Sequence, residues 1–415
     1  MVRQYLRVVR AAEKRNVATV SLGDDGLFCP SSTHRPIVLF QQGRGHLRMH
    51  TDSSAREGNP LLPAAWRILL ALLHREPLSQ TDIRERTGLS HPIVVQQVAR
   101  LRQVGLISCG KPLSGQPGRP PVPLMFNWDY RRLLAIEVRR SGMTAQVTNL
   151  AGMPLGAAQQ FPLSAWNHDT IRHELIAVIR QLLGEKGMPW AGVGIVIPGV
   201  TSRDSDAIIS WSDFPAWQND PLGAELSAEL DLPVIIEPAG RALACAFFGA
   251  HRTDVSHIVA ISLRHLPQVQ VGVIAEGVLL RGATGRAGEV SQLLTEHGQP
   301  GQTLDALFRT ALEAPEQRAS AVRALADVLA TLMAAVSPDH VILQGDDAWS
   351  EADSRLVRDT LVAHGCSRTL PRLVECPNRA DEALAGIAYR SRHATLDLQT
   401  GMLAGWAGVT ISDGV

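Results

Sequence analysis

The sequence is poor in cysteine, and its few cysteines form no framework. They are scattered through 415 residues without a CxxC pair: Cys29, Cys109, Cys245, Cys366 and Cys376. An odd number of dispersed cysteines excludes a disulfide scaffold and a cysteine-based metal site, and it favours a reducing cytoplasm.

The sequence also lacks net charge and long apolar runs. Its 40 basic residues equal its 40 acidic residues, so no global positive field draws the chain onto nucleic acid. No apolar run approaches membrane-spanning length, and the basic N-terminus lacks the apolar core of a signal peptide. We therefore expect a soluble cytoplasmic protein without a membrane partner, with two or three domains because of its length.

The segment 78–105 has the pattern of a helix-turn-helix. Ser79 and Asp82 predict a capping box, Gly88 a tight left-handed turn, Ser90 the cap of a second helix and Pro92 its first turn. Five apolar residues fall on one buried stripe: Ile83, Leu89, Val94, Val98 and Leu101. An ordinary helical hairpin inside a globular domain is the alternative.

The flanking sequence favours DNA binding over that alternative. An amphipathic helix at 66–73 precedes the pair, and two short apolar strands, 106–109 and 122–126, enclose a basic Gly/Pro loop typical of a β-wing. Six basic residues between 84 and 119 face a single acid, Glu85, which suits phosphate contacts: Arg84, Arg86, Arg100, Arg102, Lys111 and Arg119.

The second helix is therefore the candidate recognition helix. We expect Val95 and Gln96 to face base edges, with Gln96 or Gln97 able to bond adenine, while His91 and Arg100 contact phosphates or flanking positions. The candidate DNA-binding residues are Ser90, His91, Val95, Gln96, Gln97, Arg100, Lys111 and Arg119.

From residue 133 onward, strands alternate with helices. This order predicts an α/β body of two related lobes. Strands are expected at 134–138, 144–148, 193–197, 234–236, 258–263, 269–275 and 341–343, with helices at 168–186, 240–249 and 316–336.

The winged helix, the Gly118-Arg119-Pro120 link and a body with Pro198-Gly199 and Ala287-Gly288-Glu289 together resemble the ROK family of bacterial repressors and sugar kinases, over residues 60–392. The resemblance implies an N-terminal winged helix-turn-helix followed by a two-lobe actin-like ATPase fold with a sugar site in the cleft. It also likens Arg119 to an arginine that family regulators place in the minor groove. The expected domains are an N-terminal extension (1–58), the DNA-binding domain (59–128), the sugar-kinase-like body (129–395, with lobes 129–250 and 251–395) and a tail (396–415).

The chain departs from the kinase motifs of that family. Arg139 and Arg140 stand where a phosphate loop needs two glycines, so we expect their side chains to fill the phosphate space. Pro238 replaces the catalytic aspartate, and the segment 295–302 has lost the cysteines of the zinc loop, keeping only His297. We therefore expect no enzymatic activity, no metal and no cofactor.

What remains of the cleft suggests a sugar or sugar-phosphate effector held by Asp213, Glu237, Glu289 and Gln292. Glu289 is the strongest of these, because a carboxylate can accept two hydroxyls. Three alternatives stay open: Trp217 is only core, Glu289 pairs with Arg281 or Arg286, or the body binds another effector or serves only to dimerise.

These features favour a transcriptional repressor of carbohydrate genes. A homodimer or homotetramer would place two winged helices on a palindromic operator in double-stranded DNA, and the resemblance implies release by lobe closure around an effector. The rival classes are a residual sugar kinase and an interaction module whose body docks a protein partner.

Overall fold

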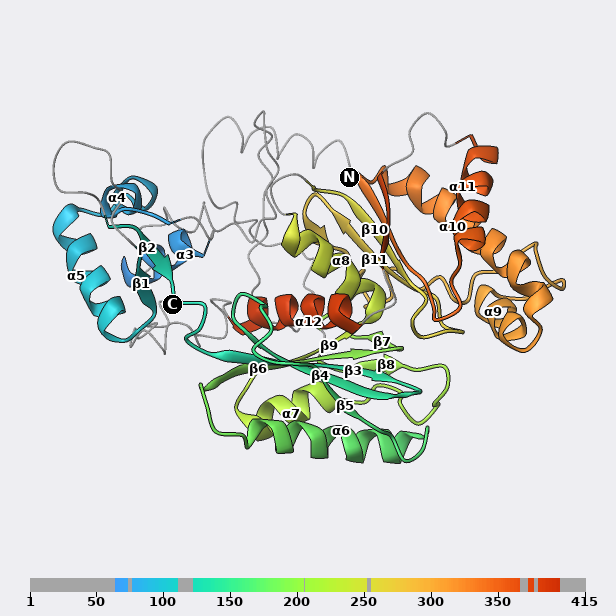
Figure 1. Ribbon diagram of the computed structural model, residues 1–415, viewed down its shortest axis with the longest axis horizontal. Coiled ribbons are helices and arrows are strands. Elements are labelled where there is room, and N and C mark those ends of the chain that lie inside the picture. Colours follow the sequence, from blue (N-terminus) through green and yellow to red (C-terminus); the bar gives the residue numbers. More distant parts are fainter. Residues whose placement is uncertain are drawn as a thin grey trace, which may run out of the picture. The chain divides into compact units, whose positions relative to one another are not determined.

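The computed structural model describes residues 64–73, 77–110, 122–204, 206–251, 255–365, 372–376 and 380–395 (Figure 1). The expected N-terminal extension and C-terminal tail lie outside these residues, as do Lys111 and Arg119 of the wing loop.

The N-terminal part is a three-helix head with a two-stranded wing. Its elements are α3 (Ala64–Leu72), α4 (Gln80–Thr87), α5 (His91–Gln103), β1 (Ile107–Cys109) and β2 (Leu124–Phe126). The wing strands pair antiparallel, as expected. The stripe expected from Ile83 to Leu101 is buried, and α3 is enclosed on all sides instead of presenting a polar face.

The helix signals in the head are confirmed with one exception. Ser79 and Asp82 form the reciprocal capping box, and Gly88 ends α4 with φ of 65°. Ser90 occupies the N-cap position of α5, as expected, but its side chain makes no capping hydrogen bond. The expectation that the Ser90 side chain caps the helix is therefore wrong. Pro92 lies in the first turn, where the missing N–H has no partner to lose.

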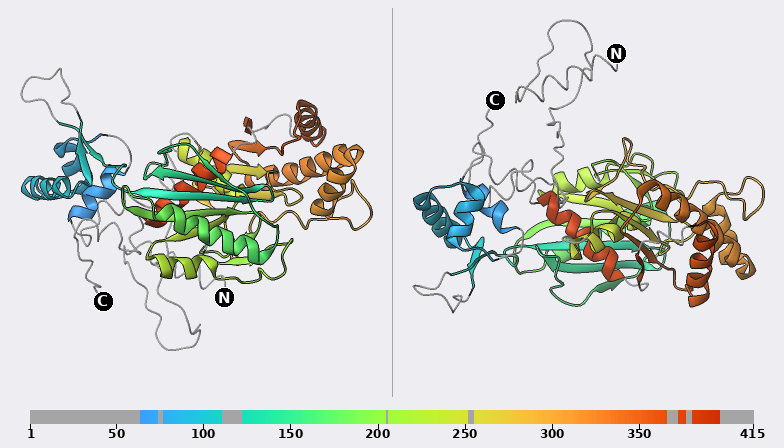
Figure 2. Two further views of the ribbon diagram at one scale, coloured as in Figure 1. Left: turned by 60° about the horizontal axis from the view of Figure 1, so that its bottom comes forward. Right: turned by 90° about the horizontal axis from the view of Figure 1, so that it is seen from above.

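The body contains two five-stranded sheets (Figures 1 and 2). The first has the order β5-β4-β3-β6-β9, formed by Gln159–Phe161, Gly142–Asn149, Arg132–Arg139, Trp190–Ile197 and Val234–Pro238. The second has the order β12-β11-β10-β13-β14, formed by Val278–Leu279, Gln270–Ala275, Ile258–Ser262, His340–Gln344 and Arg372–Cys376. Each sheet pairs an antiparallel hairpin, β3–β4 or β10–β11, with parallel strands.

Helices cover both faces of each sheet. On one face of the first sheet, side chains of β3 pack against α6 (His168–Leu183) and α7 (Leu222–Leu230). On the other face, the alternate side chains of β3 pack against α12 (Ala380–Thr395). The second sheet packs on α9, α10 and α11 with one face and on α8 with the other. These helices span Leu304–Glu313, Arg318–Val336, Glu351–Ala363 and Ala239–Ala250, respectively. Of them, α7, α9, α11 and α12 were not anticipated from the sequence.

The two lobes exchange helices. Helix α8 ends at residue 250 yet packs on β10 and β11, whereas α12, the last described helix, packs on β3, β6 and β9. The two helices also pack on each other, so closely that a Cβ on Gly386 of α12 would overlap the carbonyl oxygen of Ala242 in α8. A division of the body at residue 250 does not describe this exchange.

The expectation that no apolar run approaches membrane-spanning length is wrong when length and composition alone are considered. The helical segment Pro315–Val336 contains an 18-residue stretch with a mean hydropathy of 1.6, enough to cross a membrane by that measure. In the structure, Val322, Leu325 and Leu329 of this segment are buried in the core beside the second sheet. Packing against protein therefore accounts for these three apolar positions.

Replacing Gly386 with alanine should lower the free energy of unfolding by about 1–3 kcal/mol, because the added methyl group forces α12 away from α8. The helical preference of alanine over glycine acts in the opposite direction, by about 1 kcal/mol. Urea denaturation measures the difference. Gly156→Ala is the control, since its Cβ would meet no heavy atom within 4 Å. Equal stability of the two variants would contradict tight α8–α12 packing.

Candidate DNA-binding surface and inter-lobe cleft

Helix α5 presents one face of the head to solvent. His91, Val95, Gln96 and Arg100 are exposed and Gln97 is half-buried, while Val94, Val98 and Leu101 on the other face are buried. Ser90 is exposed at the start of the helix. Ile93 is also exposed, at 39%, and the sequence did not single it out. Side chains in the first two turns of a recognition helix are those that reach base edges.

The cleft between the lobes contains a buried ion pair that joins the two sheets. Glu137 of β3 accepts two hydrogen bonds from Arg264, which follows β10, at 2.8 and 2.6 Å. Both side chains are almost completely buried, at 0% and 2% exposed. Glu137 stands where the kinase motif has its metal-positioning aspartate, so the carboxylate at this position is already engaged.

His265 fills the same part of the cleft in neutral form. Its Nε2 lies 3.2 Å from the carbonyl oxygen of Val138. Burial, and then the neighbouring charges of Arg264 and Arg139, lower its pKa to about 3. A neutral imidazole can donate to the carbonyl without adding charge to the buried ion pair beside it.

The two arginines of the β3–β4 turn do not lie as expected. Arg139 forms an ion pair with Asp347 of the second lobe at 3.5 Å. Arg140 is 66% exposed and pairs with Asp213 at 3.1 Å, with its guanidinium over the ring of Trp166. They diverge into separate ion pairs, so the expectation that both fill a phosphate space is wrong for Arg140.

Glu237 is not placed to hold a sugar. Its side chain is completely buried, with Arg281 at 2.5 Å, Arg390 of α12 at 3.3 Å and Arg241 of α8 at 3.4 Å. Burial alone would raise its pKa, but the arginines outweigh burial and lower the pKa to about 2. We therefore correct the expectation that Glu237 contacts an effector: its carboxylate binds three elements of the body together.

The segment at 212–217 contributes structure more than ligand contacts. Asp213 accepts hydrogen bonds from Gln268 at 2.8 Å and from the indole of Trp166 at 3.2 Å. Trp217 is 1% exposed and stacks on Trp211 with ring centroids 4.5 Å apart. Trp217 is therefore core, and Asp213 is held by neighbours before any ligand arrives.

A cavity of about 200 Å³ lies between the lobes. Its polar lining includes Ser212, Gln268, Gln270, Arg286, Glu289 and Gln292. Burial raises the pKa of Glu289, while Ser291 and Arg286 act in the opposite direction. Arg281 is engaged by Glu237, so it is not the partner of Glu289. Two of the four expected sugar ligands, Glu289 and Gln292, thus line one cavity.

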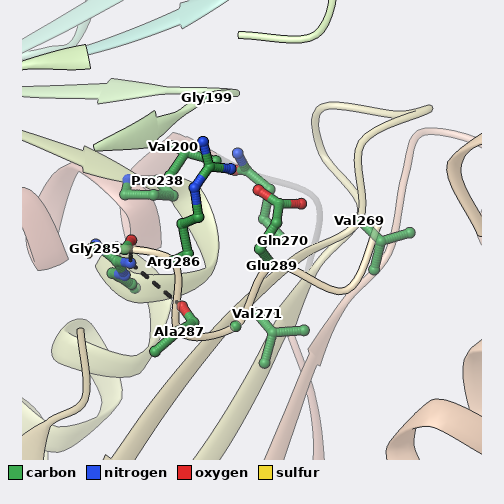
Figure 3. A pocket seen from close by; sticks show the side chains of 12 residues that line it. Gly199, Val200, Pro238, Val269, Gln270, Val271, Gly285, Arg286, Ala287 and Glu289 are labelled. Atoms are coloured by element: carbon green, nitrogen blue, oxygen red, sulfur yellow. Dashed lines mark hydrogen bonds between the residues drawn. The ribbon is translucent and has the colours of Figure 1, made fainter. Parts of the chain in front are cut away.

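A smaller pocket adjoins this cavity and shares Arg286, Gln270 and Glu289 with it (Figure 3). Arg241 closes its inner side by donating hydrogen bonds to the carbonyl oxygens of Gly285 and Ala287. The loop that carries Arg286 and Glu289 is therefore tied to the Glu237 ion-pair cluster.

Helix α12 connects that cluster with the link to the head. Arg390 contacts Glu237, and two residues later the guanidinium of Arg392 lies 5.5 Å from the ring centroid of Trp128. The Trp128 carbonyl accepts a hydrogen bond from Leu150 N at 2.9 Å. Trp128 also packs edge-on against Phe126 of β2, with ring centroids 4.9 Å apart. The sequence held no signal for this arrangement, because it depends on how α12 packs.

His297, the residue left in the former zinc loop, has a protein partner. Its Nε2 lies 2.6 Å from Asp327 of α10, whose second oxygen lies 2.7 Å from Nε2 of His364. Within the described residues, no group of three or more His, Cys, Asp or Glu side chains has the geometry of a metal site.

Comparisons with known proteins identify both parts of the chain. Residues 60–109 match the MarR family and residues 134–302 match the ROK family. The xylose repressor of Bacillus subtilis (strain 168) is 25% identical over 240 residues, covering 56% of this chain and 60% of that repressor. The xylose repressor of Caldicellulosiruptor bescii is 25% identical over 233 residues, covering 54% and 56%. The chain thus matches less than two thirds of the length of these relatives.

Solved structures establish the fold. A ROK family transcriptional regulator, homologous to the Mlc protein of E. coli, has a TM-score of 0.62 at 18% identity, covering 83% of this chain and 98% of that one. A ROK family glucokinase from Streptomyces griseus, in complex with glucose and AMPPNP, has a TM-score of 0.50 at 17% identity, covering 63% and 99%.

The fold defines a class: a winged-helix head followed by a two-lobe α/β body. More particularly, the head lies within the match to the MarR family at residues 60–109, and the match to the ROK family at residues 134–302 lies in the body.

Replacing Arg264 with methionine should lower the free energy of unfolding by about 3–5 kcal/mol, because Glu137 is then buried without a counter-charge. The double variant Glu137→Leu/Arg264→Met should recover most of that loss, since neither charge remains. Urea denaturation of the single and double variants measures both.

The control is Arg358→Met, which removes an exposed pair with Glu375 and should cost no more than about 1 kcal/mol. A double variant as unstable as Arg264→Met alone would mean that packing of the arginine stem, and not its charge, holds the lobes.

Proposed function

We propose that this protein is a sequence-specific DNA-binding repressor of carbohydrate-metabolism genes, with a small-molecule effector bound between the lobes of its ROK domain. The observation that carries the proposal is the exposed face of α5 on a MarR-type head. That head is joined to a body matching the ROK family, in which Glu137 and Glu237 are engaged by internal ion pairs and Pro238 stands at the position of the catalytic base. The matched xylose repressors support the same function.

The body acts as a sensor and not as a kinase in this proposal. Phosphoryl transfer needs a carboxylate base near the sugar hydroxyl and an open phosphate site. Here Pro238 holds the position of the base, and Glu137 and Glu237 are bound by arginines. Incubation with ATP and either glucose or xylose should therefore release no ADP above the rate without sugar.

We further propose a cytoplasmic homodimer or homotetramer whose two heads read a palindromic operator. Two-fold symmetry of the protein then matches two half-sites about one or two helical turns apart. Ser90, His91, Val95, Gln96, Gln97 and Arg100, together with Lys111 and Arg119 of the wing loop, are the proposed DNA contacts.

Selection of genomic fragments with the purified protein, followed by a gel-shift salt titration on the best fragment, tests the proposal. A palindromic site with a steep dependence of affinity on salt supports it. Salt-sensitive binding without a preferred site would contradict it, and would direct attention to a protein partner of the body.

Replacing Gln96 with alanine should relax sequence preference at one operator position by about 1–3 kcal/mol, because a base-edge contact is lost. Arg100→Ala, on the same exposed face, should instead weaken binding to all sequences about equally and lower the salt slope by about one. Gel shifts on the operator and on single-base variants measure both changes. Equal loss on every sequence for both variants would contradict these assigned roles.

Effector binding is proposed to reach the head through α12. The pocket loop is tied to Arg241, Arg241 and Arg390 share Glu237, and Arg392 on the same helix covers Trp128. A shift of the loop would change the position of α12, and α12 would change the link to β2. This route needs a small displacement of a packed helix and leaves the Glu137–Arg264 pair between the lobes intact.

Replacing Arg392 with methionine should therefore preserve operator affinity within about threefold but abolish release by effector, since the contact with Trp128 is lost. The readout is the gel-shift midpoint with and without whichever of xylose, glucose, glucuronate or glucose 6-phosphate releases the wild type. Arg355→Met, on the exposed face of α11, is the control and should respond normally. Normal release of Arg392→Met would exclude this route.

A further inference from the structure

Some charged side chains around the inter-lobe cavity have an ion-pair partner and others have none. Three carboxylates near it have arginine partners: Asp213 pairs with Arg140, Asp305 with Arg309, and Glu237 with its three arginines. Glu289 and Arg286, both in the cavity wall, are different. Among the described residues, the exposed side chain of Arg286 makes no hydrogen bond and no ion pair within 4 Å, and only its backbone carbonyl accepts a hydrogen bond, from Glu289 N at 3.2 Å.

Arg286 is directed into the cavity region and not away from it. Its guanidinium extends toward the Gly199–Val200 turn, alongside Gln270 and Glu289 (Figure 3). Gln270 has no capacity to neutralise it, and both ends of its amide are engaged by the backbone at Ala239 and Ile197. The guanidinium therefore offers a planar fork of donors to whatever enters.

Glu289 does not cancel that charge. Its carboxyl group is buried enough for its pKa to be raised, and the nearby Asp305 acts in the same direction. Arg286 lowers the pKa of Glu289 through space, but the two groups form no ion pair. A carboxyl that tends to keep its proton is a hydrogen-bond donor, and it tolerates a second acidic group beside it.

We infer that the effector is an anionic sugar whose carboxylate or phosphate pairs with Arg286 while its hydroxyls bind the amides and hydroxyls of the cavity wall. This inference rests on the proposed function and names the ligand class of the same site. Arginine suits both anions because its fork matches two oxygens of either group. The carboxyl group of Glu289, in the same cavity wall, is a further hydrogen-bonding partner for the ligand.

Four probes with related rings test the inference: xylose, glucose, glucuronate and glucose 6-phosphate. Glucose, glucuronate and the phosphate differ only at C6, so they separate a neutral, a carboxylate and a phosphate ligand. Titration calorimetry on the full chain without DNA measures affinity, and the fluorescence of Trp211, which lines the cavity, reports occupancy. At least one of the two anions should bind about tenfold or more tightly than either neutral sugar.

Arg286→Gln should remove that preference and leave the affinities for neutral sugars within about twofold. Arg355→Gln makes the same charge change on α11, away from the cavity, and should retain the preference. Stronger binding of the neutral sugars, an unchanged preference in Arg286→Gln, or no binding of any probe at millimolar concentration would each overturn the inference.

The dependence of glucuronate affinity on pH gives an independent check on Glu289, with Arg286, Ser291 and Asp305 as the groups that face it. As pH rises through the raised pKa of Glu289, the carboxylate forms, repels the ligand and ceases to donate. Affinity should therefore fall as pH rises through that raised pKa, while the glucuronate carboxyl stays ionised. Glu289→Gln should bind with little pH dependence. An increase in wild-type affinity with pH would contradict the role of Glu289.

Failure of this inference and failure of the proposed function are distinguishable, because ligand binding is measured without DNA. Glucuronate binding by a protein that selects no operator would overturn the repressor proposal and support the anion site. A selected operator with preference for neutral sugars would do the reverse.

Discussion

Carboxylates that lie in the body away from water dictate how its parts fit together. Burying an ionised carboxylate costs several kcal/mol unless a positive partner with good geometry accompanies it. Glu137 meets this condition only with Arg264 of the other sheet, and Glu237 only with arginines from α8, α12 and the segment after β12. The lobes are therefore fixed relative to one another at two points by charge as well as by apolar packing.

The same ion pairs bear on the proposal that this kinase-like body is not a kinase. In this chain, Glu137 at the position of the metal-positioning carboxylate pairs with Arg264, Pro238 stands at the position of the base, and the adjacent Glu237 pairs with arginines. The cavity beside them is lined by amides, hydroxyls, the carboxyl group of Glu289 and the guanidinium of Arg286, which are groups that can hydrogen-bond a polar ligand.

Helix α12 connects the Glu237 ion pairs with the segment that leads to the head. It packs on the first sheet and on α8, and two of its residues within a single turn, Arg390 and Arg392, contact Glu237 and Trp128. Close approach at Gly386 permits this packing, because a larger side chain would collide with α8. The last helix that the structure describes thereby connects the ion-pair cluster beside the cavity with the link to the winged-helix head.

The sequence by itself determined the local structure. The capping box at Ser79, the left-handed Gly88 and the apolar stripe of α5 depend on neighbouring residues, so the head could be predicted, and motif order predicted the body fold. The missing cap at Ser90 and the true roles of Glu237 and Arg140 could not. Glu237 pairs with Arg281 and Arg390, which lie 44 and 153 residues away, and Arg140 pairs with Asp213, 73 residues away. Only the tertiary structure decided which charged side chains form ion pairs. Pairing across a cleft depends on how distant elements pack, and this packing cannot be predicted from the spacing of neighbouring residues.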